Sequence, residues 1–310
     1  METHATTLRQ IQGLLRAGAA GLVINLVGPL GAGKTALLDE RGETAGGGDF
    51  PAAASADCRA VVLADGSTAL VVDGVDTSSS ARALLTVVGR GGWMPVVAAS
   101  RLPLLSRAGW AGYGRGLVTL PVPRWPDGEI EQLAARNPAA DAATLELVVA
   151  LSGGIPLIAD YLCRTVADGT SAAFAGAAAC PAVDEILRRL ESEHLTSQDA
   201  SALMTLAAVG EADEELLASL TGCRLEQSPF ASLSRLSIVA RSAHGLTVKE
   251  PYRLMLDLVH RWRRPLAHRA MLTKAAESRR RLLTGTSADD PDAAGIATQL
   301  AFLTGNRTGT

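Results

Sequence analysis

Residues 28–35 read Gly28-Pro29-Leu30-Gly31-Ala32-Gly33-Lys34-Thr35, and they follow an apolar run from Leu22 to Val27. The pattern GxxxxGK[ST] behind such a run is typical of a strand, a phosphate-binding loop and the start of a helix. In this arrangement main-chain N–H groups point at phosphate oxygens, the lysine reaches the β/γ oxygens and the hydroxyl binds magnesium. Lys34 is also the only lysine before Lys249, and the other basic residues in that part of the chain are almost all arginine. A compact ammonium at this position predicts a nucleotide-triphosphate site.

The predicted nucleotide ligands are the loop residues and the residue that follows them. We expect the nucleotide, ATP or ADP, to contact Gly28, Pro29, Leu30, Gly31, Ala32, Gly33, Lys34, Thr35 and Ala36.

Composition bounds the remaining function classes. The chain has 310 residues, enough for about two domains, and a net charge of −3, which disfavours a general polyanion binder. No basic leader precedes an apolar core, and no apolar run approaches the ~18 to 20 residues that cross a bilayer. The widely spaced cysteines predict neither a metal site nor a disulfide framework, and they favour a reducing cytoplasm; they are Cys58, Cys163, Cys180 and Cys223.

Short apolar runs in the first part of the chain predict an α/β fold with a parallel sheet. After the run at 22–27, further runs occur at 61–63, 70–72, 96–98 and 117–120. Short apolar runs between helical or loop segments indicate strands buried on both faces. Helices are expected at 7–17 and after a cap at Ser78–Ser80, stopped by the glycines from Gly89 onward. The glycine-rich residues 42–58 are expected to be a flexible connector.

The second part of the chain is predicted to be mainly helical. Helices at 129–136, 142–151 and 155–166 suggest a small lid, and further helices run from 184 to 236. Strands at 238–241 and 246–249 then predict a winged helix, whose third helix, 229–236, would begin at Ser228-Pro229. Helices over 252–283 close the fold, and a helix near 293–303 lies in the tail. The predicted domains are 1–122 for the nucleotide, 123–181 for the lid, 182–283 for the winged helix and 284–310 for the tail.

Two carboxylates after the strand at 70–72 are candidates for the chemistry. Asp73 ends an apolar strand, as a Walker-B aspartate does, and with Thr35 it would hold Mg²⁺. Its neighbour is Gly74, whereas many hydrolytic enzymes place a glutamate there to activate water. Asp76 is the remaining candidate to position water. Each aspartate has a structural alternative, since Asp73 can cap the following turn and Asp76 can cap a helix.

Two further positions are candidates for contacts with the nucleotide. Arg101 follows the strand at 96–98, where a guanidinium would face the γ-phosphate; otherwise it is a solvated residue before Leu102-Pro103. Pro156 opens a helix after Ser152-Gly153-Gly154, where its ring could pack against adenine. A simple helix start is the alternative. We take Lys34, Asp73, Asp76 and Arg101 as the candidate catalytic residues.

In this order, the motifs GPLGAGKTALLDE, LVVDGVD, VVAASR and SGGIPL resemble those of the STAND class of P-loop ATPases, which includes NB-ARC and NACHT proteins and large LuxR-type regulators. The resemblance covers roughly residues 5 to 283. It implies ATP/ADP exchange between open and closed arrangements of the ATPase, lid and winged-helix units. It also implies that Lys34 and Thr35 hold phosphate and magnesium, Asp73 completes the metal shell, Arg101 senses phosphate and Pro156 touches the base.

The sequence departs from the STAND pattern in several places. Met255-Leu256-Asp257 resembles the MHD segment, but Leu256 replaces the histidine that contacts ADP; a core stripe is the alternative. The span from Thr35 to Leu70 is short, Thr77 stands where an acid is frequent, and no repeat array or effector domain lies within the chain. The replacement at Leu256 predicts a less firmly latched ADP state, and the other three departures favour slow or absent hydrolysis.

Three functions compete. The first is an ATP-binding regulatory switch with weak ATPase activity, which would act on a protein partner or through self-association. The second is a winged-helix regulator that binds DNA, which is disfavoured because the expected third helix carries only Arg235 as a cation. The third is a scaffold locked on ADP, and a small-molecule kinase is a minor option. The helices from 253 onward are rich in arginine, which indicates either a solvated face or a surface for nucleic acid or an acidic partner.

Overall fold

In a computed structural model, the described residues are 2–17, 21–39, 58–62, 68–90, 94–113, 116–136, 141–167, 175–286 and 291–305. The chain divides into two compact units. The first holds residues 1–132 and 154–157, and the second holds 133–153 and 158–310. Of the expected connector 42–58, only Cys58 lies among the described residues.

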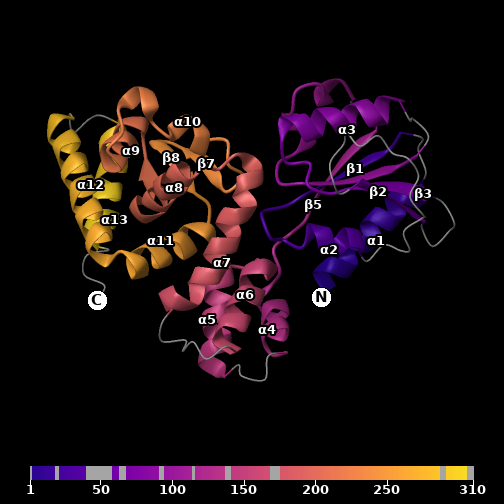
Figure 1. The fold of residues 1–310 in the computed structure, drawn as a ribbon, viewed down its shortest axis with the longest axis horizontal. Coiled ribbons are helices and arrows are strands. Elements are labelled where there is room, and N and C mark those ends of the chain that lie inside the picture. The colour runs from indigo at the N-terminus through magenta and orange to yellow at the C-terminus, as the bar shows by residue number, and fades with distance from the viewer. Residues whose placement is uncertain are drawn as a thin grey trace. The chain divides into compact units, whose positions relative to one another are not determined.

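The first unit is built on a five-stranded sheet in the order β2-β3-β4-β1-β5, and the mostly parallel α/β architecture is confirmed (Figure 1). β1 pairs in parallel with both β4 and β5, and β3 pairs in parallel with β4. The carboxyl ends of these four strands therefore share one edge of the sheet. The strands are β1 Val23–Val27, β2 Cys58–Val62, β3 Thr68–Val72, β4 Val96–Ser100 and β5 Leu117–Pro121.

The expectation of an all-parallel sheet is wrong for β2, which runs antiparallel to β3, with Cys58 opposite Val72 and Val62 opposite Thr68. The physical reason is the short link, residues 63–67, because a parallel crossover needs a dozen or more residues. Asp65-Gly66 within this link is a strong hairpin signal in the sequence. β2 therefore forms an edge hairpin instead of a second crossover.

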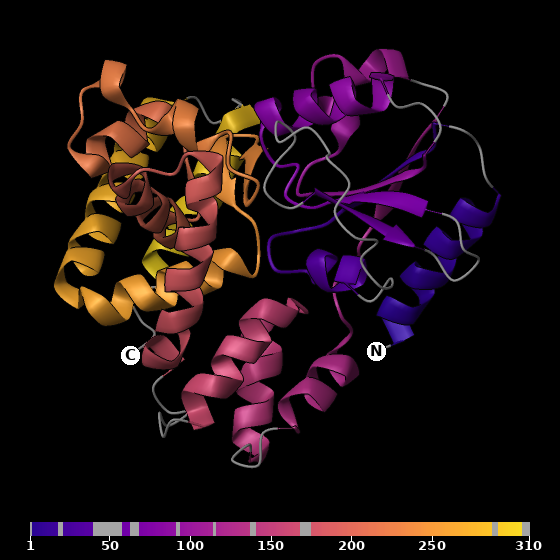
Figure 2. The ribbon, with the colours of Figure 1, turned by 45° about the vertical axis from the view of Figure 1, so that its right-hand side comes forward.

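Helices cover both faces of the sheet (Figure 2). α1, Glu2–Arg16, and α2, Lys34–Asp39, pack on one face through Ile11, Leu37 and Leu38, against Ile24 and Leu26 of β1. The other face is covered by α3, Ser78–Arg90, and by the 3₁₀ turns η1, Leu104–Ser106, and η2, Trp110–Tyr113. The sheet is buried between these two layers, as the short apolar runs predict.

The start of α3 differs slightly from the prediction. The serines Ser78–Ser80 lie in its first turn, and the Thr77 hydroxyl accepts a hydrogen bond of 3.1 Å from the Ser80 N–H. Thr77 therefore takes the capping position predicted for the serines. Gly89 lies within the helix, which continues to Arg90.

A buried amide connects β1 to the loop after β4. Asn25 is fully buried, its Nδ2 donates to Ser100 Oγ at 2.8 Å, and its Oδ1 accepts from the Leu104 N–H at 3.0 Å. Ser100 Oγ donates in turn to the Leu102 carbonyl at 2.8 Å. This network fixes the loop that carries Arg101 relative to the strand that leads into the glycine loop.

We expect Asn25→Val to destabilise the first unit by about 2 to 3 kcal/mol, because the buried Leu104 N–H loses its acceptor and Ser100 Oγ loses a donor. Hydrogen exchange of the β1 and β4 amides under native conditions measures this local loss. Ser106→Ala is the control, since that hydroxyl makes an exposed hydrogen bond in the same loop, and its effect should stay within about 0.5 kcal/mol. Equal protection in Asn25→Val and the wild-type chain would contradict the expectation.

The second unit is mainly helical. The predicted lid helices are α4 Asp127–Ala134, of which the first unit takes the first part, α5 Ala142–Ser152 and α6 Pro156–Ala167. α7, Ala175–Leu190, is followed by the short turn η4, Glu191–Glu193. Next come α8 Ser197–Val209, β6 Glu211–Ala212, α9 Glu214–Thr221, η5 Leu225–Gln227, α10 Phe230–Leu233, β7 Val239–Ser242 and β8 Gly245–Val248. β8 pairs antiparallel with both β6 and β7.

The third helix of the predicted winged helix is much shorter than expected. The prediction covers 229–236, whereas α10 spans only Phe230–Leu233, with Pro229 at its N-cap. The next two residues continue as 3₁₀-like turns, in which the Leu236 N–H donates to the Leu233 carbonyl. The N–H and the hydroxyl of Ser237 both donate to the Glu193 carboxylate, at 2.5 and 2.7 Å. This carboxylate holds the chain away from a helical path.

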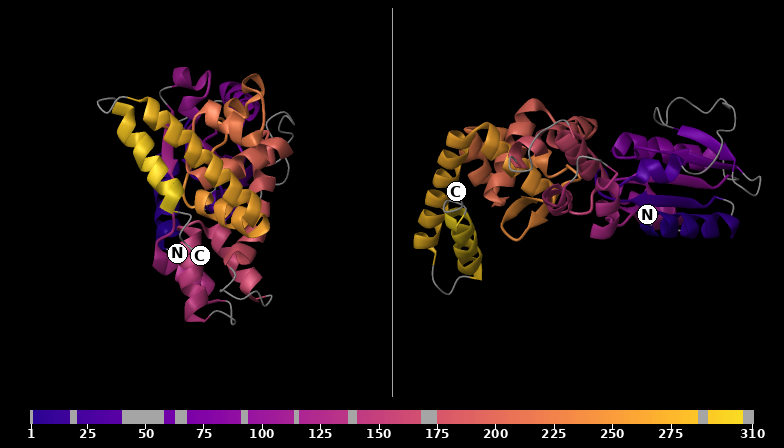
Figure 3. Two further views of the ribbon diagram at one scale, coloured as in Figure 1. Left: turned by 90° about the vertical axis from the view of Figure 1, so that its left-hand side faces the viewer. Right: turned by 90° about the horizontal axis from the view of Figure 1, so that it is seen from below.

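Three helices close the second unit: α11 Tyr252–Arg263, α12 Pro265–Gly285 and α13 Pro291–Gly305. The predicted closing segment is divided at Arg264, because Pro265 cannot continue a helix but suits the first turn of the next one. α13 accounts for the helix expected in the tail, and it packs beside α12 (Figure 3).

Candidate nucleotide site

The glycine loop leaves β1 at its carboxyl end and leads directly into α2, as the motif predicts. Gly31 and Gly33 have φ values of +78° and +88°, a region that favours glycine. The side chains of Leu30 and Ala32 are buried, so only their main-chain groups are available to a ligand. The loop therefore presents backbone to its surroundings, which is what phosphate binding requires. Ala36, the last residue predicted to contact the nucleotide, is exposed in the first turn of α2.

Lys34 folds back over the loop that precedes it. Its Nζ donates to the carbonyl of Gly28 at 2.8 Å and to that of Pro29 at 2.9 Å. An ammonium has donors in three directions and can bridge carbonyls that a planar guanidinium would not fit. The positive charge is thus held next to the loop.

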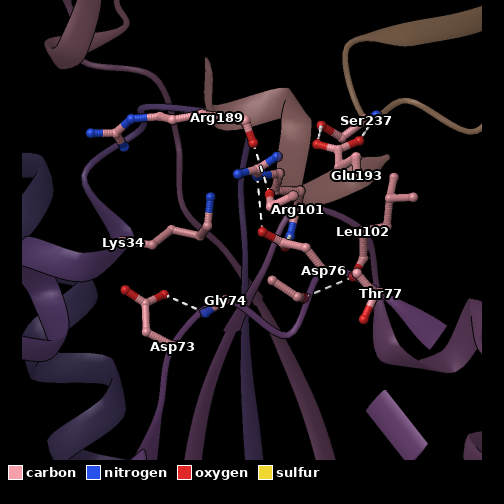
Figure 4. Close-up of polar contacts among 12 residues, drawn as sticks. Lys34, Asp73, Gly74, Asp76, Thr77, Arg101, Leu102, Arg189, Glu193 and Ser237 are labelled. Atoms are coloured by element: carbon pink, nitrogen blue, oxygen red, sulfur yellow. Dashed lines mark hydrogen bonds and ion pairs between the residues drawn. The ribbon is translucent and has the colours of Figure 1, made fainter. Parts of the chain in front are cut away.

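Thr35 and Asp73 meet although β4 lies between the strands that lead to them. The Thr35 hydroxyl donates to Asp73 Oδ2 at 2.5 Å, and the Gly74 N–H donates to Asp73 Oδ1 at 2.8 Å. A hydroxyl and a carboxylate oxygen side by side are hard ligands of the kind that Mg²⁺ prefers. The residues present therefore fit a magnesium ion. Figure 4 shows Lys34 and Asp73 together on this side of the sheet.

A pocket of about 430 Å³ adjoins this pair, and its lining includes Thr35, Asp39, Cys58, Arg59, Val71 and Asp73. Arg59 of β2 forms an ion pair with Asp39 of α2 across it. Burial raises the pKa of the Cys58 thiol, so the thiol stays protonated at neutral pH and is no candidate nucleophile.

Asp76 and Arg101 are brought together by the pairing of β3 with β4. Asp76 Oδ1 accepts from the Arg101 N–H at 2.8 Å, and Asp76 Oδ2 lies 2.9 Å from Arg101 Nε. Arg107 Nη2 also donates to the Asp76 carbonyl at 2.6 Å. These contacts differ from both alternatives, which were a helix cap for Asp76 and a solvated side chain for Arg101. The sequence gives no local signal for this pair, because the two residues become neighbours only through the strand order.

Pro156 lies beside the glycine loop in the same unit. The segment 154–157 belongs to the first unit, and the Leu157 N–H donates to the Gly31 carbonyl at 3.3 Å. The Trp125 N–H donates to the Gly154 carbonyl at 2.8 Å, which ties this segment to the chain after β5. Pro156 is the first residue of α6. Its predicted contact with adenine stays a prediction.

The segment that resembles the MHD motif lies in the core of the second unit. Met255 and Leu256 are fully buried, which matches the alternative of a core stripe. Asp257 Oδ1 lies 2.7 Å from Nε2 of the buried His268. Leu256 therefore stabilises the packing of α11, and its alkyl side chain has no donor for a phosphate.

The arginine-rich closing helices are partly engaged in internal contacts. Arg253 pairs with Glu250 at 2.5 Å, and Arg263 pairs with Asp184 at 2.9 Å. Arg279 is buried and pairs with Asp213 at 2.6 Å, and Lys274 donates to the Ser219 carbonyl. Arg263 and Lys274 stay exposed despite these contacts, and the other exposed cations of this set are Arg261, Arg264, Arg269, Arg280 and Arg281. Part of the basic charge is thus engaged within the second unit.

The described residues include neither a membrane-spanning helix nor a cluster of metal-ligating side chains. None of their helices combines the length and the apolar character needed to cross a membrane. Within the same ranges, no group of three or more histidine, cysteine, aspartate or glutamate side chains is arranged to hold a metal ion.

No protein-family profile matches the chain, and no curated protein sequence matches it. Among solved structures, it is similar to a Signal Transduction ATPase with Numerous Domains (STAND) from Pyrococcus horikoshii that has a tetratricopeptide repeat sensor. The identity is 12%, the TM-score is 0.34, and the match covers 96% of this chain and 49% of that one. The chain thus spans about half the length of that protein.

The chain is also similar to point variants of RuvB from Thermotoga maritima. One has 17% identity, a TM-score of 0.43, and coverage of 80% of this chain and 90% of that one. A second has 18% identity and a TM-score of 0.41, with coverage of 73% and 84%. Likenesses of this degree concern the fold alone.

Proposed function

We propose that the first unit binds ATP and ADP with Mg²⁺ at the glycine loop, and that the chain is a regulatory switch with slow ATPase activity. The observation that carries the proposal is the meeting of three groups at one edge of the sheet. These are the Lys34 ammonium beside the loop, the Thr35 hydroxyl and the Asp73 carboxylate. Each has the chemistry that a phosphate chain with its metal requires.

The roles of these groups follow from their chemistry. Main-chain N–H groups of residues 28–35 and the Lys34 ammonium would bind the phosphates. Thr35 and Asp73 would hold Mg²⁺, which neutralises phosphate charge when bound. The Arg101 guanidinium would meet the terminal phosphate and so distinguish ATP from ADP. Pro156, beside the loop, would contact the base.

Slow hydrolysis is part of the proposal because the site offers little to activate water. Gly74, the neighbour of Asp73, has no side chain, and both carboxylate oxygens of Asp76 accept contacts from Arg101. A general base must have an oxygen within hydrogen-bond reach of the attacking water.

The switch would consist of units that rearrange with the nucleotide. We propose that residues 123–181 form a lid and that 182–283 form a winged helix, with 1–122 as the nucleotide domain and 284–310 as the tail. The support is the order α8, α9, α10 and the hairpin β7–β8, to which β6 adds a strand. The four-residue α10 is too short to read a DNA groove, so a protein partner or self-association is favoured over DNA. A reducing, cytoplasmic setting belongs to this proposal, since all four cysteines are free thiols.

The direct test is to denature the purified full chain, identify any released nucleotide, and then titrate the native chain with ATP and ADP with and without Mg²⁺. We expect Mg²⁺ to tighten ATP binding at least tenfold, and Thr35→Ala to remove most of that gain because a metal ligand is lost. Thr86→Ala is the matched control, since Thr86 is exposed on α3 in the same unit.

The outcomes separate the competing functions. Bound nucleotide with slow turnover supports the switch. ADP that copurifies, with no turnover and the same partner binding in both nucleotide states, indicates the locked scaffold. If no nucleotide is released and none binds in the titration, the proposal is contradicted. Salt-sensitive retention on random duplex would favour the DNA-binding alternative.

A further inference from the structure

One carboxylate connects the turn after β3 to the loop after β4. Both carboxylate oxygens of Asp76 contact Arg101. Oδ1 accepts a hydrogen bond from the main-chain N–H of Arg101, and Oδ2 pairs with its Nε. Its main-chain carbonyl accepts from Arg107, a few residues further along the same loop. Figure 4 shows Asp76 directly beside Arg101.

The two backbones on either side of this pair are also fixed. In the turn, the Val75 N–H donates to the Ala99 carbonyl of β4 at 3.0 Å, which carries the β3–β4 contact beyond the last paired residues. In the loop, Ser100 Oγ donates to the Leu102 carbonyl, so hydrogen bonds fix the residues on both sides of Arg101. The direction in which the arginine leaves the sheet is therefore set.

The contact with Nε has a specific consequence for a guanidinium. This group is planar, so fixing Nε against a carboxylate restricts the plane of the whole fork. The two terminal nitrogens, which would bind a phosphate, then keep one orientation. Without the carboxylate, the long side chain would have to be ordered whenever a phosphate binds, which lowers affinity.

We propose that Asp76 is a positioning residue for Arg101 and not an acid that positions water. It orients the guanidinium toward the terminal phosphate, and so sets how strongly the chain prefers a nucleoside triphosphate over a diphosphate. This inference rests on the proposed nucleotide site. It differs from the role that the position of Asp76 in the sequence suggests.

The two roles give different phenotypes. A water-positioning acid affects turnover, and its loss leaves the ratio of ATP to ADP affinity unchanged. A positioning residue for Arg101 affects this ratio, and its loss resembles the loss of Arg101 itself. The two substitutions are then not additive, because removing either member removes the same interaction.

The experiment measures the dissociation constants of ADP and of a non-hydrolysable ATP analogue, both with Mg²⁺, for the full chain by calorimetry. The variants are Asp76→Ala, Asp76→Asn, Arg101→Ala and the double variant Asp76→Ala/Arg101→Ala. Asp127→Asn serves as the matched control, because this carboxylate is exposed on α4. The turnover of ATP by each variant is measured in parallel.

We expect Asp76→Ala to lower the ratio of the ADP to the analogue dissociation constant about tenfold, with ADP affinity within about twofold of wild type. Arg101→Ala should give the same loss, and the double variant should add nothing. Asp76→Asn keeps an oxygen for the Arg101 N–H but loses the ion pair, so its ratio should be intermediate. Asp127→Asn should leave the ratio unchanged.

The ADP affinity shows whether each variant is folded at the site. If Asp76→Ala fails to fold, Asp76→Asn decides by the same ratio. An unchanged ratio with reduced turnover would overturn the inference in favour of a water-positioning acid, while the nucleotide site would stand. A wild-type ratio of the two dissociation constants near one would also overturn the inference, because Arg101 would then not distinguish ATP from ADP. A wild-type chain that binds neither nucleotide would overturn the proposed function and this inference together.

Discussion

Lys34→Ala should raise the dissociation constant of Mg–ATP at least ~100-fold, which corresponds to about 2.7 kcal/mol or more. The ammonium lies against the loop, with Nζ 2.8 and 2.9 Å from the Gly28 and Pro29 carbonyls. An alanine leaves the main-chain N–H groups of the loop but removes the cation that neutralises the terminal phosphates. Isothermal titration calorimetry with Mg–ATP measures the loss.

The chain offers a matched control for this substitution. Lys274 is an exposed lysine on α12 whose Nζ also contacts a main-chain carbonyl, that of Ser219. Lys274→Ala removes the same charge and the same kind of hydrogen bond. Because Lys274 lies outside the proposed nucleotide site, this variant should leave nucleotide affinity unchanged. Lys34→Arg should behave like Lys34→Ala, because a planar fork does not fit between the loop carbonyls. Wild-type affinity in Lys34→Ala would remove the basis of the nucleotide site.

The parts of the fold that the sequence predicts well are those set by local patterns. The apolar runs locate β1, β3, β4 and β5 to within a few residues. β1, β3 and β4 are buried on both faces, whereas β5 is only partly buried but keeps the same apolar character. The glycine loop and the start of α2 follow from one motif. The closing helices follow equally from local patterns.

Two elements were predicted less well because tertiary contacts decide them. The direction of β2 depends on its hairpin with β3, for which Asp65-Gly66 was the available signal. The length of α10 depends on Glu193, which binds the N–H and the hydroxyl of Ser237 from a distant part of the sequence. No periodicity in 229–236 reveals that contact.

The same distinction between local patterns and tertiary contacts applies to the candidate site. Lys34 and Thr35 are predictable from spacing, because the loop geometry is local. The contact of Thr35 with Asp73 needs the strand order, which places β4 between β1 and β3. The pairing of Asp76 with Arg101 likewise needs the β3–β4 register, so residue types alone leave their roles open.

Gly31→Ala should strongly weaken nucleotide binding for a steric reason that the loop motif alone does not contain. A Cβ built on Gly31 lies 2.6 Å from Leu157 Cβ and 3.2 Å from Ile155 Cγ2. Both neighbours belong to the segment 154–157, whose Leu157 N–H donates to the Gly31 carbonyl. Because Leu157 Cβ is bound directly to the backbone, no side-chain rotation relieves the contact. The loop and this segment must move apart.

The φ of +78° at Gly31 adds strain for any other residue, so the two effects must be separated. Gly222 has a similar φ of +72° at the end of α9, and a Cβ there meets nothing within 4 Å. Gly222→Ala therefore carries only the backbone strain, about 1 kcal/mol. The difference between the two alanine variants isolates the crowding against Leu157.

We expect Gly31→Ala to weaken Mg–ATP at least ~30-fold and to destabilise the first unit by about 1 to 3 kcal/mol more than Gly222→Ala destabilises the second. Calorimetry measures the first effect, and hydrogen exchange of the β1 and α2 amides measures the second. Gly222→Ala should bind nucleotide like the wild-type chain. If Gly31→Ala did so too, the segment that begins α6 would not be packed on the glycine loop, and the proposed place of Pro156 beside the nucleotide would lose its support.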